Sequence, residues 1–140
     1  MGLGTLRFGL TLLATVAATS LAAQTASVRP PAVVPAEDRA AYDAAFQESL
    51  SKPADPDTLV KFATVAVKIG DLEGAISALE RLLLIDGDNP DIQLELGVLY
   101  FRLGSLEAAR SYLAAVRDSR RASPETKARA VSFLREARNP

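Results

Sequence analysis

The sequence predicts an all-α fold, a short α-solenoid of antiparallel helix pairs with about six helices. The main evidence is a repeat, because Pro56, Pro90 and Pro124 are equally spaced along the chain. Residues 56–89 and 90–123 are identical at eight positions, where average residue usage gives roughly two or three by chance. Each proline also follows a residue type that caps helices and precedes an acid. A helix is therefore expected to start at each of these prolines.

Residues 1–23 have the pattern of a secretory signal peptide. Arg7 supplies the basic region, residues 8–18 form an apolar run, and small residues follow as far as Ala23. The run is too short and too rich in threonine to span about 30 Å of hydrocarbon. Cleavage after Ala22 and cleavage after Ala23 both fit. The sequence thus predicts an exported chain, located in the periplasm or, alternatively, secreted.

Residues 24–35 are predicted to form a proline-rich leader, because three prolines fix φ and remove backbone donors there. From Ala36 the sequence becomes rich in alanine, and Glu37 and Asp38 suit the positive end of a helix dipole. Pro53 ends this first helix. One helical repeat domain is expected over residues 36–140.

Each repeat is predicted to be a helix pair. The first helix ends at Gly70 or Gly104, where a left-handed residue is favoured, and the second ends at the 86–89 turn. Residues 92–96 alternate like a strand, and Asp86-Gly87 fits a hairpin turn. The matching segment 58–66 does not alternate, so the repeat favours helix. Residues 124–138 form a last, capping helix.

This pattern resembles the tetratricopeptide repeat, in which a helix pair recurs with the same period. The second repeat carries the resemblance in Leu96-Gly97, Tyr100, Gly104, Ala109, Leu113 and the closing Pro124. The first repeat carries it in Phe62-Ala63, Ala66, Gly70, Ala75, Leu79, Leu82 and Pro90. The resemblance implies a right-handed solenoid whose concave surface is lined by the first helix of each pair.

The resemblance also implies where a partner would bind. The positions that line the concave surface form a predicted partner-binding groove, which consists of Val60, Thr64, Val67, Lys68, Leu94, Val98, Phe101 and Arg102. An apolar groove of this kind suits an amphipathic helix or an extended segment of another protein. Alternatively, Tyr42, Phe46 and Leu50 of the chain's own first helix fill it.

The composition argues against catalysis. The chain has no His and no Cys, so the commonest general base, the commonest transition-metal ligand and a thiol nucleophile are missing. The loop from Asp86 fails as a calcium site because Asp91 and Gly97 stand where an EF-hand needs Gly and Glu. We therefore expect no catalytic residues, no metal and no cofactor.

Charge is unevenly distributed. Residues 71–107 hold eight acids and two bases, and residues 108–138 hold eight bases and three acids. The basic part lacks interleaved aromatic residues, so nucleic acid is not an expected partner. An alternative function is a structural or envelope-anchored spacer whose basic carboxy-terminal end contacts membrane or an outer-membrane protein.

Residues 94–113, together with the predicted export, also resemble the periplasmic repeat region that precedes an outer-membrane β-barrel in some proteobacterial proteins. This second resemblance implies a module of the bacterial cell envelope that binds another protein.

Overall fold

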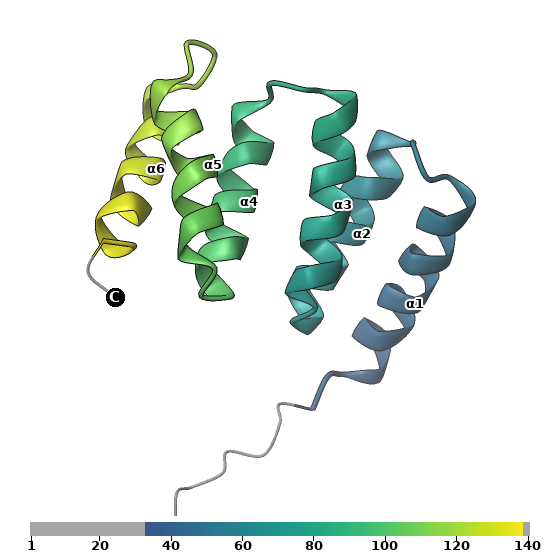
Figure 1. The fold of residues 1–140 in the computed structure, drawn as a ribbon. Helices are drawn as coiled ribbons and strands as arrows, with labels where there is room; N and C mark the ends of the chain where they lie inside the picture. The colour runs from purple at the N-terminus through teal and green to yellow at the C-terminus, as the bar shows by residue number, and fades with distance from the viewer. Residues whose placement is uncertain (1–32, 139–140) are drawn as a thin grey trace, which may run out of the picture. The chain divides into compact units, whose positions relative to one another are not determined.

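The computed structural model describes residues 33–138, and six helices follow one another there without a strand (Figure 1). Their bounds are α1 Ala36–Ser51, α2 Pro56–Ile69, α3 Leu72–Ile85, α4 Pro90–Arg102, α5 Leu106–Asp118 and α6 Pro124–Glu136. The predicted all-α repeat fold is confirmed. The predicted signal peptide and most of the predicted leader, residues 24–32, lie outside the described residues.

Helices α2, α4 and α6 begin with the capping residues that the sequence predicts. Asp55, Asn89 and Ser123 each precede a proline at the first helical position, and each accepts a hydrogen bond from a backbone N–H of the first turn. Gly70 and Gly104 adopt φ values of +85° and +76° in the turns that follow α2 and α4. An L side chain rarely adopts this conformation, so glycine is required at both places.

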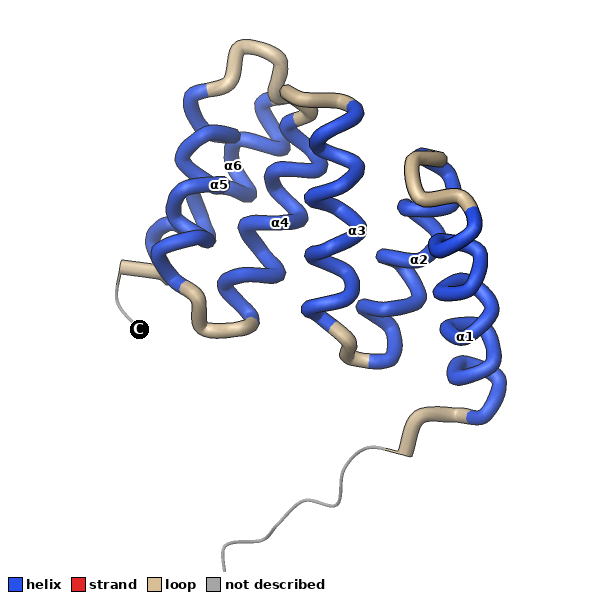
Figure 2. The backbone as a smooth tube through the Cα atoms, turned by 45° about the vertical axis from the view of Figure 1, so that its right-hand side comes forward, coloured by secondary structure: helices blue, strands red, loops and turns tan. Residues whose placement is uncertain are grey.

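Neighbouring helices in the chain pack against one another, and each runs antiparallel to the next (Figure 2). Figure 1 shows α3 and α5 in front of α2 and α4. Helix α4 also packs directly on α6, whereas no Cα of α2 lies within 8 Å of a Cα of α4. The same holds for α3 and α5. The two repeats are therefore joined mainly through α3 and α4.

Two buried clusters hold the helices together. The first consists of Ala45, Leu59, Phe62, Ala63, Ala66, Ala75, Ile76, Ala78, Leu82, Leu96 and Leu99, and so reaches from α1 into α4. The second consists of Leu94, Ala109, Leu113, Val116, Ala122, Ala130 and Leu134, and joins α4, α5 and α6. Helix α4 contributes to both clusters because it stands between them.

Two tyrosine hydroxyls make hydrogen bonds between helices. Tyr42 of α1 donates to Asp71, the residue that caps α3, at 2.6 Å. Tyr100 of α4 donates to Glu80 of α3, also at 2.6 Å, across the junction of the two repeats. The hydrogen bond to the carboxylate, followed by burial, raises the pKa of each phenol to about 12. Both phenols therefore stay protonated as donors at neutral pH.

Helix α1 precedes the first repeat along the chain. It packs on α2, where Tyr42 and Phe46 contact the ring of Phe62 with centroid distances of 5.5 and 5.7 Å. At the other end, α6 exposes Arg135 and Glu136. A polar outer face on the last helix suits a terminal cap of a repeat stack. Among the described residues, no helix combines the length and apolar character needed to cross a membrane.

Candidate functional site

An apolar cleft of about 350 Å³ opens between α2 and α4. Val60, Thr64 and Val67 line it from α2, as predicted for the groove. The other lining residues are Ala63, Leu79, Glu95 and Leu99. The cleft exists because α2 and α4 stand apart at the junction of the repeats, and Val60 is 48 % exposed there.

The α2 side of the cleft offers aliphatic side chains with few polar groups. Thr64 uses its hydroxyl to donate to the carbonyl of Val60 at 2.8 Å, so its methyl group is the part left for contact. Such an i−4 bond is usual for a threonine inside a helix. Glu95 is the one carboxylate among the lining residues, and Arg129 of α6 approaches it to 3.4 Å.

A second hollow continues from Val67 toward the end of α4. Val67, Lys68, Ile69 and Gly70 line it together with Arg102 and with residues 33–35. Lys68 forms an ion pair of 2.5 Å with Asp38 of α1, and this hydrogen bond raises the pKa of the lysine. The predicted residues Lys68 and Arg102 thus place positive charge beside one end of the cleft.

The structure corrects the prediction for Leu94. This side chain is only 1 % exposed and lies in the second buried cluster, because α4 packs directly against α6. Val98 and Phe101 are half-buried beside the same cluster, where Phe101 meets Phe133 of α6 edge-on at 5.6 Å. The predicted groove is therefore divided. Its α2 residues Val60, Thr64 and Val67 line an open cleft, whereas Leu94, Val98 and Phe101 of α4 pack with the second buried cluster.

Sequence reasoning missed the residues that α4 contributes to the cleft. Glu95 and Leu99 lie one turn apart on the side of α4 that faces α2. Their spacing of one helical turn was visible in the sequence, but the repeat positions alone assigned the groove to Leu94 and Val98. Among the residues that line the cleft, none comes from α1. Tyr42 and Phe46 instead pack on Phe62, so the described part of the first helix leaves the cleft open.

The described residues offer no other chemistry at this site. Within residues 33–138, no group of three or more acidic side chains is arranged to hold a metal ion. Among the basic side chains of α5, α6 and the loop between them, Arg117, Arg121 and Arg129 each lie within 4 Å of a carboxylate oxygen. What remains is a cleft suited to apolar contact, with charges at its rim.

Comparison with known proteins identifies the repeat. Residues 66–130 match the family model of the tetratricopeptide repeat. These residues form a tetratricopeptide-repeat region. The fold of the chain is similar to the crystal structure of PcrH from Pseudomonas aeruginosa, with a TM-score of 0.53 and 16 % sequence identity over 79 % of this chain and 98 % of that chain. No curated protein matches the sequence.

Tetratricopeptide repeats are protein-interaction modules, and stacked repeats of this kind bind partners on extended surfaces. At 16 % identity the likeness to PcrH establishes the fold alone. The α2–α4 cleft of this chain must therefore be interpreted from its own residues.

Proposed function

We propose that this protein is a non-catalytic, exported interaction module of the bacterial cell envelope, which binds a helical or extended segment of another protein in the α2–α4 cleft. The observation that carries the proposal is the open apolar cleft at the junction of two tetratricopeptide repeats, with Val60 exposed in it. Export rests on the signal-peptide pattern of residues 1–23.

The size and lining of the cleft favour an anchor residue. About 350 Å³ lies at the small end of the range for binding pockets, enough for one or two aliphatic side chains. A partner segment would bury such a side chain against Val60, Val67 and Leu99 and leave its polar groups at the rim. Recognition of helices and extended segments through a few apolar anchors is a common binding mode.

Photo-crosslinking in cells tests the proposal. A photoreactive amino acid is placed at position 60 of the full chain, and crosslinked products are identified by mass spectrometry. Glu107, an exposed residue at the start of α5 outside the cleft, is the matched control position. The proposal expects a partner protein that crosslinks from position 60 and not from position 107.

Two results would overturn the proposal. A crosslink from position 60 only to α1 of the same chain would mean that the protein fills its own cleft. The same products from positions 60 and 107 would mean that the contacts are non-specific.

A further inference from the structure

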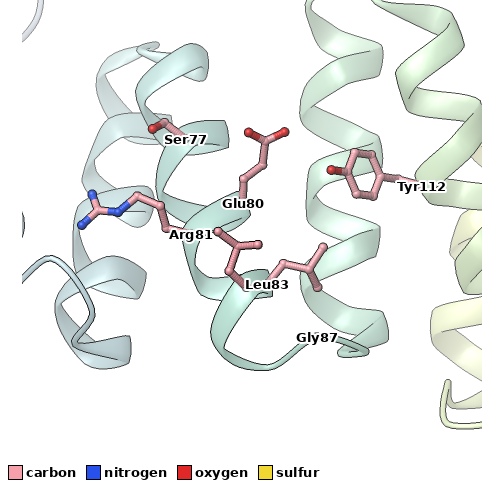
Figure 3. A pocket seen from close by; sticks show the side chains of 7 residues that line it. Ser77, Glu80, Arg81, Leu83, Gly87 and Tyr112 are labelled. Carbon is pink, nitrogen blue, oxygen red and sulfur yellow. The ribbon is translucent and has the colours of Figure 1, made fainter.

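A larger cleft lies between α3 and α5 and is not used by the proposed function. Its volume is about 640 Å³, within the range of ligand pockets. Ser77, Glu80, Arg81, Leu83, Leu84, Gly87 and Tyr112 line it. Figure 3 shows that Tyr112 enters from the α5 side, while the other labelled residues belong to α3 and the turn that follows it.

The end of α3 exposes large apolar side chains beside this cleft. Leu84 is 86 % exposed and Ile85 is 48 % exposed. The fold does not need them, because the second repeat has Asp118 and Ser119 at the two equivalent positions. Departures from an otherwise consistent pattern tend to mark functional positions. The first repeat therefore has an apolar surface at the end of its second helix, and the second repeat lacks it.

The same helix end is also unusually acidic. Asp86 and Asp88 follow α3 directly, where the carboxyl end of the helix dipole already carries partial negative charge. Each of α2, α4, α5 and α6 has a basic residue in its last turn, whereas α3, like α1, has none. Asn89 donates a hydrogen bond to Asp86 at 2.8 Å, and Arg121 approaches Asp88 only to 3.8 Å, so this helix end remains acidic.

The charged side chains that line the cleft also favour a basic partner. Glu80 extends from α3 toward the α5 side (Figure 3). Its carboxylate accepts a hydrogen bond from the hydroxyl of Tyr100 of α4. Arg81 points away from Glu80, and its guanidinium donates to the backbone carbonyls of Ser49 and Pro53 at the end of α1. The one base that lines the cleft is thus occupied elsewhere, and the cleft presents a carboxylate beside exposed leucine and isoleucine.

We propose that the α3–α5 cleft and the exposed end of α3 form a second docking surface, which takes a basic amphipathic segment of a partner protein. Aliphatic side chains of that segment cover Leu84 and Ile85 and enter the cleft beside Tyr112. Its lysines or arginines pair with Asp86, Asp88 and Glu80. The same occupant supplies apolar cover for Leu84 and Ile85 and positive charge for the carboxylates. This surface is separate from the α2–α4 cleft, so either proposal can fail without the other.

The test uses a designed probe, an amphipathic helical peptide of leucine and lysine, and measures its affinity for the full chain by calorimetry. Leu84→Gln keeps the size of an exposed side chain, so the fold is left intact. We expect roughly tenfold weaker binding, since burial of a leucine side chain is lost. Leu103→Gln, a change of apolar to polar at a residue that is 40 % exposed and outside both clefts, is the matched control and should leave the affinity unchanged.

A second pair of measurements tests the contribution of charge to peptide binding. Asp88→Asn should weaken binding and reduce its dependence on salt, because one attractive pair is removed. The same peptide with glutamate in place of every lysine should not bind. Equal affinity of the lysine peptide for the wild type and for Leu84→Gln would overturn the proposal, as would binding of the glutamate peptide. Self-association of the chain that Leu84→Gln abolishes would also overturn it, and would assign the surface to a second copy.

Discussion

Replacing Leu96 by alanine will lower the free energy of unfolding by about 2–5 kcal/mol. Leu96 is fully buried, and although it belongs to α4 in the second repeat, it packs in the cluster centred on the first repeat. Its removal leaves a cavity at the junction of the repeats, which are joined mainly through α3 and α4. Urea denaturation measures the loss, and it is a large part of the total because small domains are stable by only about 5–15 kcal/mol.

Leu84→Ala is the matched control for this prediction. It removes the same atoms from a side chain that is 86 % exposed, so the free energy of unfolding should change by less than about 0.5 kcal/mol. Equal losses for the two alanine variants would contradict the assignment of Leu96 to a core shared by both repeats. A second unfolding transition in Leu96→Ala would show that this core couples the repeats.

Replacing Gly97 by valine will destabilise the protein by about 1–3 kcal/mol, through crowding rather than through a cavity. A Cβ atom at position 97 would lie 2.7 Å from Cγ and 2.8 Å from Cδ2 of Leu113. Leu113 is fully buried in the second cluster and has no space to retreat, so α4 and α5 would have to separate. Thermal unfolding measures the effect as a lower Tm.

A double-mutant cycle separates this collision from the change in helix propensity. Gly97→Ala should cost stability in the wild type and cost less, or gain stability, when Leu113 is also alanine. The collision is absent in that background, and alanine favours helix over glycine by about 1 kcal/mol. Additive effects of the two substitutions would show that Gly97 does not set the distance between α4 and α5.

The helices could be predicted from the sequence because their determinants are local. Asp55, Asn89 and Ser123 cap the helices that they were expected to cap. Gly70 and Gly104 adopt the expected left-handed conformation. The equal spacing of the repeats linked these signals, and it also decided correctly between helix and strand for residues 92–96.

The candidate site could be predicted only in part, because it depends on distances between helices. Val60 and Leu94 occupy the same position in their repeats, yet one is 48 % exposed and the other is 1 % exposed. The difference arises because α4 packs on α6 while α2 and α4 stand apart. No local signal in either helix encodes that spacing. For the same reason, the exposure of Leu84 became visible only in the structure.

The central claim is that the α2–α4 cleft binds a partner protein. The most direct test takes the partner that crosslinks from position 60 and measures its affinity for two aspartate variants of this protein. Val60→Asp places a charge in the apolar cleft, whereas Leu103→Asp makes a comparable change at an apolar residue that is 40 % exposed and outside it. We predict at least roughly tenfold weaker binding for Val60→Asp and little change for Leu103→Asp. Wild-type affinity in Val60→Asp, with both variants folded, would contradict the account.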